Sequence, residues 1–265
     1  MRGEYRGAEM LSNSFIFLEG IGVARERWLW CNGVKSWDDF IDADHVPGIS
    51  VARKAKANSR LNDAKDRLRE GDATHFSSLL RQRDHWRCYD DFRDRAIFLD
   101  IETTGISRRS LVTVVGMHDG RRTHTLVRGQ GLTGEHLEAV LERAGIIVTF
   151  NGASFDLPIL DARFPGAVPR VPHLDLKHLL RRLGMTGGLK AIERDMGIER
   201  DLRVQYLTGQ DAVYLWRLWE KKGSWNSLKA LKEYNSEDCE NLRVIADRAC
   251  AEMKSKLMGA YTVTR

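Results

Sequence analysis

The sequence predicts an α/β fold in which a mixed β-sheet is flanked by helices and preceded by a smaller all-helical region. Residues 1–94 show helical patterns, whereas short apolar runs typical of buried strands begin at residue 96. The predicted order after residue 95 is three strands, a helix, a strand and then mostly helices, which implies a mixed sheet with helices on its faces. We expect an N-terminal region at 1–48, a helical connector at 49–94 and the α/β domain at 95–265.

Composition and charge narrow the class of protein. The 265 residues are 42% hydrophobic and 30% charged, as expected for a soluble, globular chain. No apolar run approaches the length needed to cross a bilayer, and the polar N-terminus lacks the apolar core of a signal peptide. We therefore expect a cytoplasmic protein with no membrane partner. The cysteines match no zinc or redox spacing and are predicted to be reduced thiols: Cys31, Cys88, Cys239 and Cys250.

A pair of glycine turns marks the N-terminal region. Gly20-Ile21-Gly22 precedes a predicted helix, Gly33-Val34 follows it, and Ser36 with Asp39 forms a capping-box-like start for the next helix. This arrangement resembles a helix-hairpin-helix element, a family in which backbone N–H groups at the glycine hairpin bind a DNA phosphate.

The N-terminal region departs from that family in two respects. Glu19 occupies a position where proline is usual, and residues 11–18 make a poor first helix. A small helical cap packed on the main domain is the alternative to a DNA-binding role, and both stay open.

Basic residues are concentrated between Arg53 and Arg69, where seven Lys or Arg face only Asp63 and Asp66, within a chain of net charge +5. A phosphate-binding strip and an ordinary solvated helix face are both compatible with this pattern.

The strand and helix predictions follow hydrophobic periodicity and turn signals. Asp119-Gly120 is a hairpin turn between two β-branched segments. The predicted strands are Ala96–Leu99, Leu111–Met117, Thr123–Val127 and Ile146–Phe150, and the predicted helices include Leu132–Arg143 and Ser227–Lys256.

Two carboxylates follow the first predicted strand. Asp100 and Glu102 are two residues apart, so in an extended chain they point to the same side. Arg95 is the one basic residue within five positions of the pair. Because two ionised carboxylates repel each other, a divalent cation such as Mg²⁺ or Mn²⁺ would supply the missing charge. The alternative is two ordinary acids at a solvated strand end.

Two further segments carry acids. Asp156 follows the strand that ends near Phe150 and begins an apolar helix, where the helix dipole alone would also favour an acid. Tyr234 and Asp238 are four residues apart and would share one helical face; a core aromatic and an exposed acid are the alternatives.

Together these segments resemble the DEDD superfamily of 3′–5′ exonucleases, which has a ribonuclease H-like fold. The placement of Tyr234 four residues before Asp238 is similar to the last motif of the DEDDy branch. FNGASFDLP at 150–158 resembles the second exonuclease motif of family B polymerase proofreading domains. With FLDIETTG at 98–105 and HLDL at 173–176, the chain looks similar to the stand-alone YprB-like group. The resemblance covers residues 96–253 well and the N-terminal part more loosely.

The resemblance implies a two-metal nuclease site. Asp100 would bridge two Mg²⁺ or Mn²⁺ ions, Glu102 and Asp238 would complete the first site, and Asp156 would hold the second, partly through water. Tyr234 would orient the attacking water and assist its deprotonation. The implied partner is nucleic acid, with DNA favoured over RNA by the glycine hairpin.

Other residues receive weaker assignments. Thr103, Thr104 and Asn151 are candidate contacts to the terminal nucleotide, and Asp175 either supports the metal site or caps the next helix. Arg108 and Arg109 are candidate backbone-phosphate contacts or simple loop surface. The helically spaced tryptophans are predicted to be core residues rather than base-stacking platforms: Trp216, Trp219 and Trp225.

Several functions remain compatible with the sequence. The leading prediction is a 3′–5′ exonuclease that acts on single-stranded DNA. A structure-specific endonuclease, an RNA exonuclease of the same fold, a catalytically inactive nucleic-acid-binding module and a metal-dependent phosphatase are the alternatives.

Overall fold

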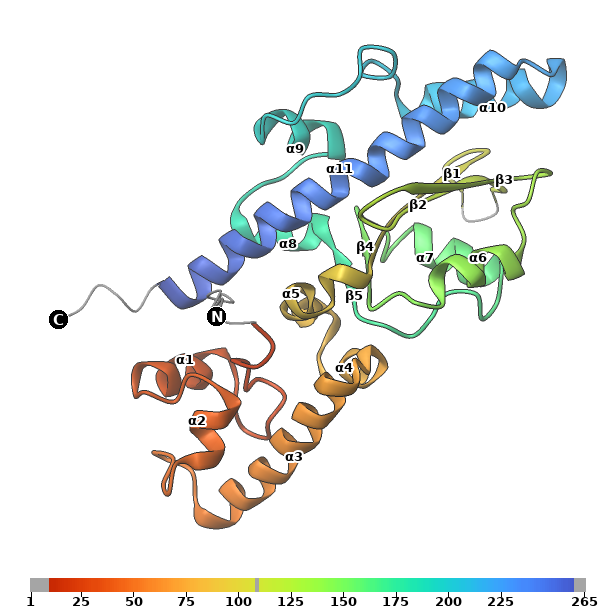
Figure 1. Ribbon diagram of the computed structural model, residues 1–265. Helices are drawn as coiled ribbons and strands as arrows, with labels where there is room; N and C mark the ends of the chain where they lie inside the picture. The colour runs from red at the N-terminus through yellow and green to blue at the C-terminus, as the bar shows by residue number, and fades with distance from the viewer. Residues whose placement is uncertain (1–9, 108–109, 260–265) are drawn as a thin grey trace, which may run out of the picture.

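The computed structural model describes residues 10–107 and 110–259 and contains a mixed sheet with helices on both faces (Figure 1). The five strands lie in the order β3-β2-β1-β4-β5, where β1 is antiparallel to β2, β2 is antiparallel to β3, and β4 and β5 run parallel to β1. The strands are β1 (Ala96–Thr103), β2 (Val112–His118), β3 (Thr123–Val127), β4 (Ile146–Thr149) and β5 (His173–Asp175).

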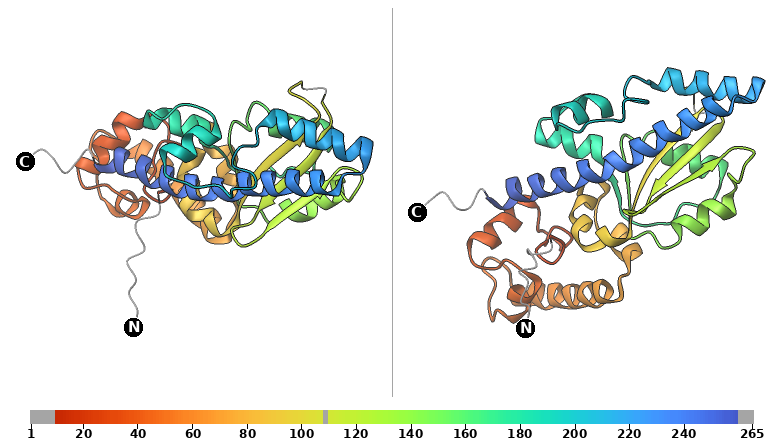
Figure 2. Two further views of the ribbon diagram at one scale, coloured as in Figure 1. Left: turned by 90° about the horizontal axis from the view of Figure 1, so that it is seen from above. Right: turned by 45° about the horizontal axis from the view of Figure 1, so that its top comes forward.

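The helices divide between the two faces of the sheet. In Figures 1 and 2, α6 and α7 lie on one face, and α11 crosses the other face with α10 beside it. The helices of this domain are α6 (Gly134–Leu141), α7 (Asp156–Arg163), α8 (Leu176–Leu183), α9 (Leu189–Asp195), α10 (Gly209–Lys222) and α11 (Trp225–Met258).

The alternation of side chains along β1 decides which residues meet each layer. Ile97, Leu99 and Ile101 pack with side chains of α6 and α7 in one apolar cluster. Because successive strand side chains point to opposite faces, Asp100 and Glu102 lie on the face that α11 covers. This confirms the predicted common side of the two acids, although they lie inside the strand rather than after it.

Close packing of α11 on the sheet depends on Gly116 of β2. A Cβ atom at this position would lie 2.7 Å from the Cys239 sulfur and would clash with the side-chain oxygen of Asn235. The missing side chain therefore allows α11 to pack directly against β2, which places its polar residues over the acids of β1.

The N-terminal region is helical, as predicted, and it shares a hydrophobic core with the sheet domain. One continuous buried cluster includes residues from Met10 to Leu257. Residues 11–18 form turns rather than a helix, while Ser36 and Asp39 form the predicted capping box. The elements are α1 (Val23–Cys31), α2 (Trp37–Asp42), α3 (Val51–Glu70), α4 (Ala73–Leu79), η1 (Gln82–Cys88), α5 (Tyr89–Phe92) and η2 (Arg93–Arg95).

A buried ion pair joins the N-terminal region to the connector. Glu26 of α1 and Arg87 of η1 lie 2.9 Å apart, and their side chains are 0% and 1% exposed. The hydroxyl of Ser14 and the backbone N–H of Phe15 also donate to Glu26, so each buried charge has partners. The division of the chain at residues 48 and 94 stays a prediction.

The structure also tests the predictions for the cysteines and for the tryptophans. All four cysteines are free. Trp216 is buried, as predicted for a core residue, whereas Trp225 is 66% exposed, with its ring 4.6 Å from that of Trp219, so the core prediction was wrong for Trp225. In the described part of the chain, every helix is too short or too polar to cross a membrane.

Candidate metal centre

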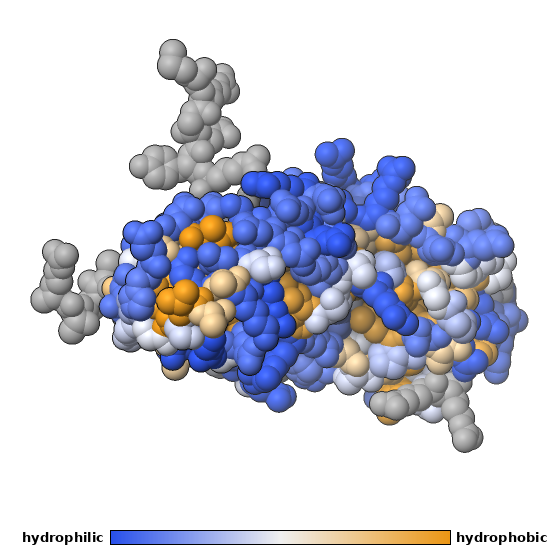
Figure 3. All heavy atoms as spheres, turned by 90° about the horizontal axis from the view of Figure 1, so that it is seen from below, coloured by the Kyte–Doolittle hydropathy of each residue, from blue (hydrophilic) through white to orange (hydrophobic). Residues whose placement is uncertain are grey.

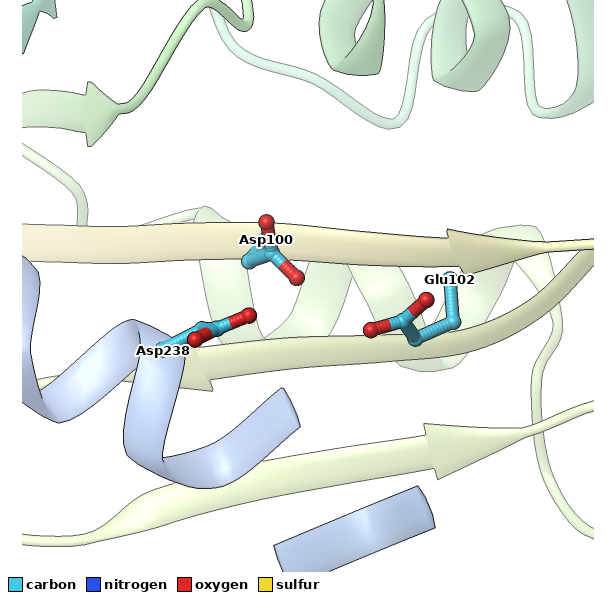
Figure 4. Close-up of side chains that lie close together, drawn as sticks. All are labelled: Asp100, Glu102 and Asp238. Atoms are coloured by element: carbon cyan, nitrogen blue, oxygen red, sulfur yellow. The ribbon is translucent and has the colours of Figure 1, made fainter. Parts of the chain in front are cut away.

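Three predicted site residues converge on the face of the sheet beneath α11. Asp100, Glu102 and Asp238 each offer a carboxylate oxygen, and these oxygens all lie within 4.8 Å of one another. Figure 4 shows the side chains of Asp100 and Glu102 on β1 and that of Asp238 on α11 turned toward a common space. Segments more than 130 residues apart in the sequence therefore build one acidic cluster.

Asn235, one turn before Asp238 on α11, holds Asp100 in place. Its side-chain amide donates to the carboxylate of Asp100 at 2.9 Å and to the backbone carbonyl of the same residue at 3.2 Å. Because Asn235 is fully buried against β2, this contact sets the position of α11 relative to β1. Asn235 was not predicted as a site residue from the sequence, although it stands beside Tyr234 in the same motif.

The cluster is electrostatically costly without a counter-charge. Burial, and then repulsion by neighbouring carboxylates that include Asp238 and Asp156, raises the pKa values of Asp100 and Glu102 well above their usual range. Burial raises the pKa of Asp238 to about 6, an effect that Arg200 opposes. A bound cation would therefore favour the ionised form of these acids.

Asp156 lies beside the cluster but is not one of the three residues whose carboxylate oxygens lie within 4.8 Å of one another. It is buried at the first position of α7, and its carboxylate accepts a hydrogen bond of 3.2 Å from the backbone N–H of Ile101, between the two acids of β1. Burial raises its pKa to about 7, and Asp175 adds repulsion. The fourth predicted carboxylate is therefore adjacent to the other three.

Tyr234 is also buried on α11, at 8% exposure. The Lys190 ammonium and the Arg200 guanidinium lie 5.5 and 5.7 Å from the centre of its ring. Burial, followed by repulsion from Asp238, Glu102 and Asp100, raises the pKa of Tyr234, so the phenol remains protonated at neutral pH.

Arg200, which the sequence did not predict as a site residue, contacts the cluster directly. Arg200 donates to Asp238 and forms a two-pronged contact of 2.6 and 2.7 Å with Glu193 of α9. The side chains of Arg200 and Glu193 are only 5% and 2% exposed. The pair belongs to no recognised motif, so the sequence offered no signal for it beyond opposite charge.

Three weaker candidates make local backbone contacts. The Thr103 hydroxyl donates to the Gly105 carbonyl, and the Thr104 hydroxyl accepts from the Leu111 N–H. Asn151 has a positive φ of 69° in the turn that leads to Asp156. Arg108 and Arg109 lie outside the described residues.

Asp175 acts as a cap and a loop support in this structure. Its carboxylate accepts from the N–H of Lys177 at the start of α8, and from the N–H groups of Asn151 and Ala153 at 2.9 and 3.1 Å. Through the second pair of contacts it fixes the turn that precedes Asp156. The helix-capping alternative is therefore confirmed.

The donor set fits a hard divalent cation. Carboxylate oxygens are the ligands that Mg²⁺ and Mn²⁺ prefer, and a bound cation would offset the burial and the mutual repulsion that raise the pKa values of Asp100 and Glu102. The residues placed to bind such a cation are Asp100, Glu102 and Asp238, with Asp156 beside them.

The sheet order and the acidic centre define an α/β protein of the ribonuclease H-like class. The sequence model of the RNase H superfamily matches residues 97–250, and the chain belongs to this superfamily. The match includes the four acids and Tyr234. No curated protein and no solved structure gives a significant match to the chain.

Proposed function

We propose that this protein is a metal-dependent 3′–5′ exonuclease that hydrolyses phosphodiester bonds of nucleic acid, with single-stranded DNA as the favoured substrate. The observation that carries the proposal is the convergence of Asp100, Glu102 and Asp238 within 4.8 Å at a buried point. RNase H superfamily proteins are commonly nucleases, which supports a nucleic-acid substrate. The position of Tyr234, four residues before Asp238, supports the exonuclease assignment.

The four acids would hold two divalent cations. Asp100, Glu102 and Asp238 would contribute to one, and Asp100 and Asp156 to the other. Cations bound there supply positive charge that stabilises the attacking and leaving oxygens of a phosphodiester. Asn235 orients the Asp100 carboxylate in advance, which lowers the cost of organising the site when it is used.

Tyr234 would position the attacking water. A phenol whose pKa is raised by burial keeps its proton, so it is suited to donate a hydrogen bond to an oxygen rather than to remove a proton. This favours the orienting part of the role expected for Tyr234 over assistance with deprotonation.

The terminal nucleotide would lie beside the metal centre. We assign Thr103, Thr104 and Asn151 as its candidate contacts because they flank Asp100 and Asp156 on the same two segments. The hydroxyls of Thr103 and Thr104 bond to backbone groups of Gly105 and Leu111, and the backbone N–H of Asn151 donates to the Asp175 carboxylate.

Replacement of Asp100 by Asn tests the proposal. We expect wild type to release mononucleotides from a 5′-labelled single strand with Mg²⁺ or Mn²⁺, and Asp100→Asn to lose activity by about 10²-fold or more. Asp161→Asn, which changes an exposed acid of α7, should retain activity. Equal rates for wild type and Asp100→Asn would contradict the proposal.

Substrate topology separates the alternatives. A circular single strand should stay intact, because it has no 3′ end, while cleavage of the circle would identify an endonuclease. Matched DNA and RNA strands, compared at the same salt concentration, test the preference for DNA.

A further inference from the structure

The turn before Asp156 is held by side chains. Its three successive backbone N–H groups, at residues 151–153, donate to side-chain oxygens. The carboxylate of Asp175 accepts from the first and the third, and the hydroxyl of Thr149 accepts from the second at 3.1 Å. Thr149 and Asp175 are partners in the register of β4 and β5, so the two acceptors lie side by side. Two side chains thus guide the chain into α7, where Asp156 is the first residue.

The backbone of this turn depends on specific residues. Asn151 has a positive φ of 69°, which few residues other than glycine adopt and which asparagine tolerates. At the next position, a Cβ atom on Gly152 would lie 2.3 Å from the Thr149 hydroxyl oxygen. Glycine therefore allows the hydroxyl to approach the backbone N–H, and their hydrogen bond stabilises the turn.

Thr149 is itself held by His173, the first residue of β5 and of the HLDL segment. The Nε2 atom of His173 lies 2.8 Å from the Thr149 hydroxyl oxygen, and its Nδ1 atom lies 3.2 Å from the side-chain nitrogen of Gln82. An amide nitrogen only donates, so Nδ1 accepts, and Nε2 carries the proton that Thr149 accepts. Burial lowers the pKa of His173 to about 4, so at neutral pH the ring is neutral and keeps one donor and one acceptor.

A second histidine holds the backbone of His173. The N–H of His173 donates to Nδ1 of His85 at 2.9 Å. The Nε2 atom of His85 lies 3.3 Å from each of two backbone carbonyl oxygens at the end of α4, so this nitrogen donates. Because Gln82 and His85 belong to η1, the connector is joined through His173 to the turn before Asp156.

These hydrogen-bonded groups lie beneath a polar surface. Thr149 is fully buried, and His85 and His173 are 5% and 7% exposed. The outside of the molecule differs, because the face shown in Figure 3 is mostly hydrophilic, with small separate hydrophobic patches. Since little water reaches the buried groups, a donor that loses its protein acceptor there stays unpaired and destabilises the turn.

We propose that His173 is a positioning residue for Asp156. Its imidazole, held by the connector, fixes the Thr149 hydroxyl, which fixes the turn at 151–153 and thereby the Asp156 carboxylate beside the acids of β1. Because Asp156 is a proposed ligand of the second cation, the assignment rests on the proposed function. Replacement of a residue that supports a metal ligand typically weakens metal binding by about 10–100-fold.

Replacement of Thr149 by Val tests the contact with little change of shape. Amide hydrogen exchange of the full-length chain in EDTA should be faster at Gly152 by about tenfold or more, because its N–H loses its acceptor. Thr149→Ser keeps the hydroxyl and should restore the protection. The matched control is Thr113→Val, at a buried threonine of β2 whose hydroxyl has no hydrogen-bond partner among the described residues. Exchange as slow as in wild type for Thr149→Val would overturn the proposal.

Metal binding measures the consequence for Asp156. Electron paramagnetic resonance of free Mn²⁺ counts the ions that the full-length chain binds at neutral pH. We expect wild type to bind two ions and Thr149→Val to bind the weaker ion about tenfold less tightly, with Thr149→Ser and Thr113→Val close to wild type. Wild-type affinity for both ions in Thr149→Val would contradict the role assigned to His173.

A double variant shows whether His173 acts through Thr149. His173→Leu should weaken binding of the second ion about as much as Thr149→Val does. Thr149→Val/His173→Leu should bind it no more weakly than either single variant, because all three lose the same contact. Losses that multiply in the double variant would overturn the proposal.

The same titration separates two kinds of failure. If wild type binds no Mn²⁺, the proposed function fails and the positioning role fails with it. Normal binding by both wild type and Thr149→Val contradicts the positioning role alone.

Discussion

At the residue scale, the four carboxylates of the metal centre differ in their partners. Asp238 contacts the guanidinium of Arg200, while Asp100 contacts the neutral amide of Asn235. The pKa of Asp238, at about 6, is accordingly raised less than that of Asp100. Arg200 thus supplies part of the counter-charge from the chain itself.

Loss of Arg200 should destabilise the fold. Arg200→Met leaves Glu193 and Asp238 buried without their cationic partner, so the free energy of unfolding should fall by about 3–5 kcal/mol. Arg203→Met, which changes an exposed arginine in the same loop, is the control and should unfold like wild type. Denaturant unfolding in EDTA measures both. A wild-type midpoint for Arg200→Met would show that this network contributes little to stability.

Stability should also depend on pH and on metal. The pKa values of Asp238 and Asp156, about 6 and about 7, exceed the ordinary value near 4. The folded chain therefore binds more protons than the unfolded chain between about pH 4 and 7, and without metal its free energy of unfolding should fall as pH rises through this range.

A bound divalent cation should reverse this loss, because it favours the ionised acids. We expect Mn²⁺ to raise the Tm more at about pH 8 than at about pH 5, and Asp100→Asn to weaken the increase. Thermal unfolding with Mn²⁺ or with EDTA tests this, and an equal Tm increase at both pH values would contradict it.

The sequence predicted the acids better than it predicted their neighbours. Asp100 and Glu102 were placed on one side by the two-residue period of a strand, and the order of the three motifs predicted that Asp156 and Asp238 would lie near them. Arg200 was not predicted, because its buried ion pairs with Glu193 and Asp238 join segments that local sequence periodicity does not relate.

At the element scale, the site depends on the fit of α11 against the sheet. Helix α11 carries Tyr234, Asn235 and Asp238 on the side that packs over β1 and β2. The bounds predicted for β3, Thr123–Val127, agree with the structure, and α11 extends only two residues beyond its predicted range at each end. Strand β5 was not predicted, because its three residues are too few to show a hydrophobic period.

Gly116→Ala should disturb this fit. The added methyl group would meet Asn235 and Cys239, so α11 must shift away from β2. We expect the free energy of unfolding to fall by about 1–3 kcal/mol, together with a loss of nuclease activity as Asp238 moves. Gly134→Ala, where a Cβ atom meets no neighbour within 4 Å, should behave like wild type. Full activity in Gly116→Ala would show that the site tolerates movement of α11.

At the scale of the whole molecule, one hydrophobic cluster joins the N-terminal helices to the sheet domain, and the Glu26–Arg87 pair joins them to the connector that leads into the sheet. Arg87 also donates to the hydroxyl of Ser14, so it contacts two segments of the N-terminal region. The two parts are therefore held in a fixed relation by buried contacts. The sequence predicted the N-terminal helices and the sheet domain but not the ion pair between Glu26 and Arg87, because these two residues are 61 positions apart.

Arg87→Met should lower the free energy of unfolding by about 3–5 kcal/mol, because Glu26 would stay buried without a cation. The control is Arg93→Met, whose pair with Asp247 is solvent-accessible and contributes less than about 1 kcal/mol. Chemical denaturation of both variants measures the difference, and similar losses in the two would indicate that burial of the Glu26 pair is unimportant.

The length of α11 has a consequence for any substrate that reaches both ends of the molecule. From Asp238 to Leu257 the helix covers about 28 Å, at 1.5 Å for each residue, and its C-terminal end lies near the N-terminal helices in both views of Figure 2. Because the helix is packed along its length, the separation between these two positions is fixed. A ligand that contacts both the acids and the C-terminal end of α11 would therefore have to span at least this distance. A shorter ligand would contact one end of the helix at a time.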